Sequence, residues 1–375
     1  MSFLHLPNEL ILAISEHLSP PDLNPLIRAN RHMAILLRTS LIDRACDPSH
    51  FEPWGVKAIG FAANLEDKAT VQRILSTGLH RKTRALRPLL PRVISATRSS
   101  TAVRVLLECG LEPRGLDFLA LSEAVALGLG EAVELLLDRE NIDVNRRMFY
   151  QGQRVPLLVV AVNCSTRSAE VLKILLNHRR IDQQAVNQED WRIVHRVVYT
   201  ENKELLQVLL AHGRFNVNFE DPRYHTPLIA AASGGWEEGV QLLLDYPLIN
   251  TGMSHGVTAL HLAAMGGHDG VIRLLLKDGR FDVNQGDALD GCTPLLLAAE
   301  AGAISAVRAL LEHEGIDVNL CNYAGDTPLY DIASEREPEI VKMLLARDDI
   351  CTERVERWEC GVGIVLGGMC DSGPA

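Results

Sequence analysis

Short apolar stretches return along the second half of the chain in one fixed order. Residues 258–264 read Thr-Ala-Leu-His-Leu-Ala-Ala, a glycine pair follows, and residues 271–276 read Val-Ile-Arg-Leu-Leu-Leu. Apolar positions three and four apart predict one buried face on an amphipathic helix. A polar loop with the pair Val283-Asn284 closes the block. The pattern therefore predicts two helices joined by a tight glycine turn and followed by a loop.

The block recurs with two landmarks in constant register. A threonine opens it 18 positions before the last residue of the apolar triplet, and in four copies an asparagine follows that residue by 8 positions. Two landmarks that keep one phase indicate an internal repeat. The threonines are Thr226, Thr258, Thr293 and Thr327, and the asparagines are Asn145, Asn218, Asn284 and Asn319.

The apolar triplets extend the series towards the N-terminus through weaker copies. Units open near residues 57, 87, 119, 155, 192, 226, 258, 293 and 327, about 33 residues apart, which is the period of ankyrin repeats. The chain therefore resembles the ankyrin-repeat family, closely over the last four units and more loosely over the first five. The resemblance implies an all-α solenoid of helix-turn-helix units with β-turn fingers, in which each unit buries its apolar face by stacking on its neighbours.

Local residue choices agree with helices at these positions. Thr before Pro predicts a helix start, because the hydroxyl caps free N–H groups and Pro suits the first turn. The glycine pairs 234–235 and 266–267 predict turns with positive φ. Three further glycines, Gly213, Gly279 and Gly315, are predicted to end the second helix of their units.

Two units depart from the pattern. The second has Pro91 inside its expected first helix and extra residues at 96–100, and the fourth has an insertion around 163–168. Distorted helices are expected there, because Pro removes a backbone donor. Beyond residue 347 the repeat frays, and 348–375 is predicted to be a capping segment followed by a disordered tail.

The first 48 residues do not follow the repeat and predict three short helices. They contain Leu6-Pro7-Asn8-Glu9, an apolar helix and Asp22-Leu23, and in this they resemble the F-box, here joined to ankyrin repeats as in a fungal-type F-box/ankyrin family. The usual Val-Cys of that family is replaced by Ala29-Asn30. The resemblance implies binding to a Skp-type adaptor of a cullin–RING ubiquitin ligase. The adaptor-facing positions would be Leu6, Pro7, Glu9, Ile14, Leu18 and Leu23.

An alternative for residues 1–48 is a helical cap on the first repeat, because terminal repeats need a polar outer face. With either role the predicted organisation is the same. A helical module spans 1–48, an array of about nine units spans 49–347, and the capping segment and tail span 348–375.

Charge changes the picture in one region. The chain carries a formal net charge of −11, so nucleic-acid binding is disfavoured. Residues 68–107 nevertheless hold nine Lys and Arg and no Asp or Glu. Arg81, Lys82 and Arg84 are therefore candidates for an acidic partner or for nuclear import. The alternative is a solvated loop with scattered basic positions.

Candidate chemistry is sparse. The eight cysteines occur singly, which favours reduced thiols and an intracellular protein of the cytoplasm or nucleus. His261 and His195 occupy a repeat position where imidazole bonds to loop backbone, so both are interpreted as structural. With no metal, cofactor or catalytic motif in view, we expect no enzyme, no membrane span and protein partners only. Four aromatic residues in or beside fingers are candidate partner contacts, or else pack on adjacent loops: Tyr150, Trp191, Tyr224 and Tyr323.

These observations predict a substrate-recognition subunit of an SCF-type cullin–RING ubiquitin ligase. The F-box would bind the adaptor and the ankyrin repeats would bind the client protein. The alternative is an ankyrin scaffold or inhibitor without a link to a ubiquitin ligase.

Overall fold

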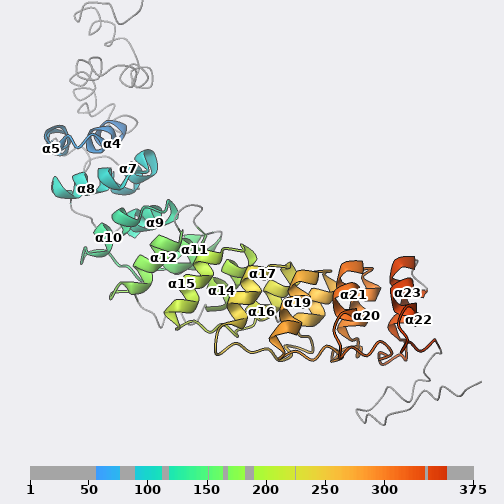
Figure 1. The fold of residues 1–375 in the computed structure, drawn as a ribbon. Coiled ribbons are helices and arrows are strands. Elements are labelled where there is room, and N and C mark those ends of the chain that lie inside the picture. Colours follow the sequence, from blue (N-terminus) through green and yellow to red (C-terminus); the bar gives the residue numbers. More distant parts are fainter. Residues whose placement is uncertain are drawn as a thin grey trace, which may run out of the picture. The chain divides into compact units, whose positions relative to one another are not determined.

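The computed structural model describes eight stretches of the chain and divides it into two units. Unit 1 is Met1–Val186 and unit 2 is Asn187–Ala375 (Figure 1). The predicted module at 1–48 and the tail beyond 352 lie outside the described residues. Those residues are 56–76, 89–111, 118–150, 152–163, 168–181, 190–223, 225–333 and 337–352.

The described part of unit 1 consists of four helix pairs and one hairpin. The first helices of successive pairs contact one another in the order α4, α7, α9, α11, and α8, α10 and α12 do so among the second helices. The antiparallel hairpin between the third and fourth pairs aligns Met148 with Val155. The elements are α4 (Val56–Asn64), α5 (Lys68–Ser76), α7 (Leu89–Thr97), α8 (Ser100–Glu108), α9 (Phe118–Ala126), α10 (Gly130–Leu137), β1 (Met148–Tyr150), β2 (Gln153–Val155), α11 (Leu157–Val162) and α12 (Ser168–Asn177).

Unit 2 repeats the same pair five times within its described residues. Helices α14, α16, α18, α20 and α22 contact one another in sequence order, and so do α15, α17, α19, α21 and α23. The loops that join successive pairs from α16 onwards lie along one side of the helices (Figure 1). The helices are α14 (Asp190–Tyr199), α15 (Lys203–His212), α16 (Pro227–Gly234), α17 (Glu237–Leu244), α18 (Ala259–Met265), α19 (Asp269–Asp278), α20 (Pro294–Glu300), α21 (Ile304–Leu311), α22 (Pro328–Ala333) and α23 (Pro338–Leu345).

The first helices begin beside the predicted unit starts. Their first residues are 56, 89, 118, 157, 190, 227, 259, 294 and 328. The prediction of repeated helix pairs is therefore confirmed. Among the described residues, the regular elements are helices apart from the one two-stranded hairpin, and Ser254 and Val257 form an isolated β-bridge.

The core lies between successive pairs because small residues let the first helices approach. Ala263 and Ala264 of α18 are fully buried, and α18 contacts both α16 and α20. In α19 the buried stripe is Val271, Ile272 and Leu275. A single pair could not bury these faces, so stability depends on neighbouring pairs.

The predicted helix starts are confirmed in unit 2. The hydroxyl of Thr226 accepts a hydrogen bond from the Ile229 N–H (3.3 Å), and Thr293 does the same for Leu296 (3.3 Å). Gly235 ends α16 with φ 75°. A side chain there would be strained, as the glycine pair predicts.

Two local predictions are wrong. Pro91 lies in the first turn of α7, where a missing N–H costs nothing, and Ser99 caps α8 by accepting from Ala102 N–H (3.3 Å). The second unit is therefore regular at this point. Gly315 does not end a helix, because α21 stops at Leu311 and Gly315 lies in the following loop without positive φ. The insertion predicted around 163–168 falls largely outside the described residues.

The junction between the third and fourth pairs of unit 1 depends on one arginine. Arg180 follows α12, and its guanidinium donates to the carbonyl oxygens of Leu137 (2.8 Å) and Arg139 (2.7 Å) at the end of α10. It also reaches the carbonyls of Glu140 and Ile142. A single cation therefore satisfies acceptors that the end of a helix leaves unpaired.

Two further expectations, on the cysteines and on membrane-spanning helices, concern the cellular compartment. Among the described cysteines, Cys109, Cys292 and Cys351 carry free thiols. None of the described helices has the length and apolar content that crossing a bilayer requires.

Candidate protein-interaction surface

The loops before the first helices of unit 2 are built alike and are termed fingers. Four of them lie at residues 218–225, 250–257, 284–292 and 319–326. Each begins with an asparagine and ends just before the residue that caps the next helix. Their geometry decides which side chains unit 2 presents to a partner.

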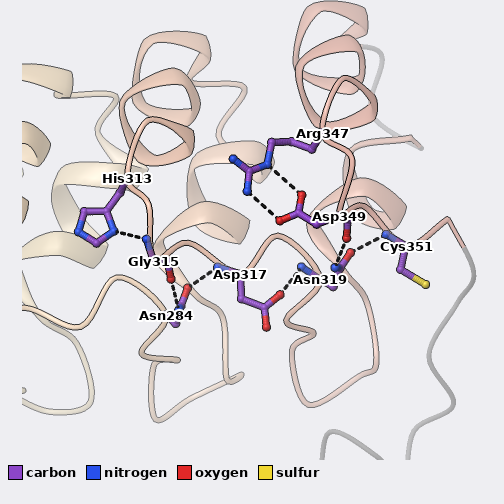
Figure 2. A network of polar contacts seen from close by, with 8 residues as sticks. All are labelled: Asn284, His313, Gly315, Asp317, Asn319, Arg347, Asp349 and Cys351. Carbon is purple, nitrogen blue, oxygen red and sulfur yellow. Dashed lines mark hydrogen bonds and ion pairs between the residues drawn. The ribbon is translucent and has the colours of Figure 1, made fainter. Parts of the chain in front are cut away.

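The asparagine that opens a finger binds the backbone of the next unit. Asn284 donates from Nδ2 to the Gly315 carbonyl (2.8 Å), and its Oδ1 accepts from the Asp317 N–H (2.9 Å) (Figure 2). Asn319 makes the same pair of bonds with the Asp349 carbonyl (2.7 Å) and the Cys351 N–H (2.7 Å). The side-chain amide thus pairs with a backbone carbonyl and a backbone N–H, as a neighbouring β-strand would. This pairing explains why asparagine recurs at the same position of the repeat.

The same contact occurs at Asn218. In addition, a hydrogen bond to the residue two positions earlier fixes the backbone of an asparagine of this kind in a turn. Asn218 donates to the Leu248 carbonyl (2.7 Å) and accepts from the Asn250 N–H (2.8 Å). Two residues before Asn284, the Asp282 carboxylate accepts from the Asn284 N–H (2.9 Å). This turn orients the amide before the neighbouring unit is reached.

A buried polar side chain fixes the turn of a finger. Asp287 is 7% exposed, and its Oδ1 accepts from the N–H groups of Asp290 (2.8 Å) and Gly291 (2.9 Å). Asn322 does the same for Ala324 (3.0 Å) in the next finger. The residues at the two turns are exposed, namely Ala288, Leu289 and Asp290 in one finger and Tyr323 and Ala324 in the next.

Backbone bonds also join the tips of neighbouring fingers. The Ala288 N–H donates to the Gly256 carbonyl (2.9 Å), and the Tyr323 N–H donates to the Asp290 carbonyl (2.7 Å). The ring of Tyr323 lies against Gly291, where an added Cβ would be 2.7 Å from the ring. The tips therefore form one continuous surface in this part of unit 2.

Large apolar side chains are exposed on the fingers. Leu289 is 72% exposed, Tyr323 55% and Phe219 43%. Exposed apolar residues grouped together mark interaction surfaces more often than isolated ones do. Of these three, sequence reasoning identified Tyr323 alone, because aromatic type was its signal. Leu289 could have been found from its place two residues after Asp287, because aspartate often forms turns through its carboxylate.

Carboxylates surround the same region. Burial raises the pKa of the Cys292 thiol to about 12, and Glu300, Asp287 and Asp290 add to this rise because they repel a thiolate. At the first finger, burial raises the pKa of Tyr199 to about 12, and its hydroxyl also donates to Asp221. Carboxylates of Asp221, Asp287 and Asp290 therefore lie in the fingers that expose these apolar residues.

The two histidines interpreted as structural are both buried. His261 is fully buried, and its Nδ1 accepts from the Thr258 N–H (3.2 Å) in a capping box. Burial lowers the pKa of His261. His195 bonds through Nε2 to the His225 carbonyl (2.8 Å) of the next finger. Among the described residues no three His, Cys, Asp or Glu side chains gather in a way that could hold a metal ion.

The other predicted contact residues are placed only in part. Tyr150 ends strand β1, and Trp191 lies in the first turn of α14. The remaining predicted residues lie outside the described residues. They are Tyr224, Arg81, Lys82 and Arg84 of the partner candidates, and Leu6, Pro7, Glu9, Ile14, Leu18 and Leu23 of the adaptor candidates.

Two cations in the described part of the basic stretch form ion pairs. Lys68 lies 2.8 Å from Glu108, and Arg104 lies 2.9 Å from Glu66 and 3.4 Å from Glu131. These acids flank the stretch in space while lying beyond its ends in sequence. The described helices therefore offer less free positive charge than the sequence alone indicates.

Comparison with known proteins agrees with this geometry. Residues 194–287 and 279–354 match the family model for ankyrin repeats (3 copies). The chain is 29% identical over 157 residues to the nuclear factor NF-kappa-B p105 subunit of Gallus gallus. It is 25% identical over 260 residues to the human transient receptor potential cation channel subfamily A member 1, and 28% over 253 residues to the ankyrin repeat protein nuc-2 of Neurospora crassa. The matches cover 41%, 66% and 66% of this chain but 16%, 22% and 23% of the relatives, so the chain spans less than a quarter of their length.

Proposed function

We propose that this chain, which carries ankyrin repeats over residues 194–354, holds a client protein on those repeats and a Skp-type adaptor on its N-terminal segment. Ankyrin repeats imply protein–protein interaction, and protein partners are therefore the premise of the proposal. The observation that carries it is the surface of linked finger tips, which exposes Leu289 and Tyr323.

The link to a ubiquitin ligase rests on the sequence of residues 1–48. Leu6-Pro7-Asn8-Glu9 and Asp22-Leu23 resemble the F-box in identity and order. The chain would then be the substrate-recognition subunit of an SCF-type cullin–RING ligase, positioning the client for ubiquitin transfer by other subunits. In this proposal the chain performs no catalysis itself.

A second candidate function is an ankyrin scaffold or inhibitor with no ligase link. It is favoured by relatives that are a nuclear factor subunit and a cation channel. Such a protein would bind its partner through the same fingers and would need no adaptor.

Co-purification of the full chain with a Skp-type adaptor separates the two candidates. The receptor requires stable binding that is lost in the double variant Leu6→Ser and Leu18→Ser. Leu248→Ser is the matched control, because Leu248 is 73% exposed on unit 2. All proteins are checked for helical content by circular dichroism. An intact, folded chain that does not bind the adaptor rejects the receptor and leaves the scaffold.

A further inference from the structure

Two neighbouring fingers of unit 2 present a small apolar surface, here termed the tip surface. It consists of Ala288, Leu289, Asp290, Tyr323 and Ala324, all of which are exposed. The bond from the Tyr323 N–H to the Asp290 carbonyl (2.7 Å) ties the two fingers together at this point. Four of the five side chains are apolar or aromatic, which is unusual for loop tips in contact with water.

The tip surface is held rigid from beneath. Asp287 and Asn322 are buried and bond to the turn N–H groups of their own fingers. Gly291 leaves room for the Tyr323 ring to rest on the preceding turn. A partner would therefore meet side chains that are already ordered, which lowers the entropic cost of binding.

The surroundings of the tip surface carry negative charge. Within the described residues 281–333, Arg308 is the single Lys or Arg, and it pairs with Glu339 (3.2 Å). Asp290 and Glu300 are exposed in the same stretch, and the negative charges of both help to raise the pKa of the buried Cys292 thiol. A partner with acidic side chains would be repelled here, and one with basic side chains would be attracted.

We propose that the tip surface docks a basic segment of a partner protein that carries a large apolar side chain among its arginines or lysines. The apolar side chain packs against Leu289 and the Tyr323 ring, and a neighbouring guanidinium or ammonium pairs with Asp290. Arginine suits this position because its planar group can stack on Tyr323 while it bonds to a carboxylate. The inference rests on the proposed protein-binding function of unit 2 and specifies the chemistry of the client.

Fluorescence anisotropy of the full chain with three labelled peptides tests the proposal. The first alternates arginine and leucine, the second replaces arginine with glutamate, and the third replaces leucine with serine. The arginine–leucine peptide is expected to bind at least about tenfold more tightly than either of the others, because charge and apolar contact are both needed. Raising ionic strength from roughly 0.05 M to roughly 0.3 M should weaken its binding, since exposed charges are screened.

A pair of matched variants locates the binding site. Leu289→Ser with Asp290→Lys is expected to weaken binding of the arginine–leucine peptide about tenfold or more. Leu248→Ser with Asp245→Lys changes the same residue types at exposed positions after α17 and should leave the affinity unchanged. Circular dichroism and light scattering confirm that both variants stay folded and keep the oligomeric state of the parent.

Several results would overturn the proposal. They are equal weakening by both double variants, no binding of the arginine–leucine peptide, and binding of the glutamate or serine peptide as tight as that of the arginine–leucine peptide. Self-association that is lost in Leu289→Ser with Asp290→Lys would instead assign the surface to a second copy of the chain. Adaptor binding is measured separately, so its failure rejects the receptor function while leaving the result at the tip surface intact.

Discussion

The two units differ in how often one asparagine contact joins neighbouring helix pairs. In unit 2 Asn218, Asn284 and Asn319 each bind a carbonyl and an N–H of the next unit. In unit 1 the corresponding Asn145 donates to the Arg180 carbonyl (2.8 Å), and the Arg180 guanidinium caps the end of α10. The asparagine contact therefore recurs at three of the four junctions described in unit 2. At the remaining one the Arg280 guanidinium donates to the Leu244 carbonyl (2.8 Å), as the Arg180 guanidinium does to the Leu137 carbonyl in unit 1.

The difference explains why one half of the repeat is easy to recognise. A contact between an amide side chain and backbone works with any partner sequence, so the same asparagine is suited to every junction. A contact between two side chains, such as the pair of Lys68 and Glu108 (2.8 Å), requires particular residues at both places. The sequence signal is therefore strong in unit 2 and weak in unit 1.

Removing the repeated contact should give the largest effect. Changing Asn218, Asn284 and Asn319 together to alanine deletes six hydrogen bonds to backbone groups. At about 0.5–1.5 kcal/mol each, the free energy of unfolding should fall by roughly 3–9 kcal/mol. Urea unfolding followed by circular dichroism measures it.

The matched variant for that experiment is Asn145→Ala in unit 1. It removes the bond to the Arg180 carbonyl and should cost about 1 kcal/mol. If the triple variant of unit 2 costs no more than this single change, the repeated contact does not stabilise the junctions and the contrast between the units fails.

Arg180→Met should give the next largest effect and is specific to unit 1. Methionine keeps the apolar stem but leaves the carbonyls of Leu137 and Arg139 without their donor. Hydrogen bonds from a charged group contribute about 1.5–3 kcal/mol, so a loss of roughly 2 kcal/mol is expected in chemical unfolding.

Arg104→Gln is the control for the same unit. Arg104 pairs with Glu66 and Glu131, but all three side chains are 40% or more exposed. Exposed pairs contribute at most about 1 kcal/mol, so this variant should be nearly neutral. A cost equal to that of Arg180→Met would show that unit 1 depends on its general ion pairs.

The smallest effect is a pH dependence that belongs to unit 2. Burial lowers the pKa of His261 below its value in the unfolded chain, which is about 6.5. As pH falls through that value the unfolded state gains a proton first, so stability present at pH 7 is progressively lost. His261→Gln keeps a side chain suited to the capping box and should flatten this part of the pH profile. Unfolding midpoints from neutral to mildly acidic pH measure the slope, and equal slopes for both proteins would contradict the assignment.

Much of the fold could be predicted because two physical signals coincide. Thr226 and Thr293 cap helices where the Thr-Pro pairs stand, and Ala263 and Ala264 are buried where small residues recur. The prediction for Gly315 was wrong, although a glycine shortly after a helix usually ends that helix. Here the backbone carbonyl of Gly315 accepts a hydrogen bond from the Asn284 side chain of the preceding unit. That function becomes visible only with the neighbouring unit in place.

The candidate surface could be predicted less well. Residue type pointed to Tyr323, but the exposure of Leu289 depends on Asp287 taking the inside of the turn, which a pattern of apolar positions does not encode. The pairing of Arg104 with Glu66 and Glu131 links residues of three helix pairs, so a window along the sequence overestimated free positive charge there. Contacts between units set both features.

The hydrogen bonds that Asn284 and Asn319 make to the next unit have a consequence for how the number of repeats in the chain can change. Its acceptors and donors are main-chain groups, which are the same whatever amino acids surround them. Deleting or duplicating one whole segment would leave each amide facing an equivalent carbonyl and N–H. These polar contacts could thus be kept when the array gains or loses a unit, while the residues at the loop tips diverge towards different targets.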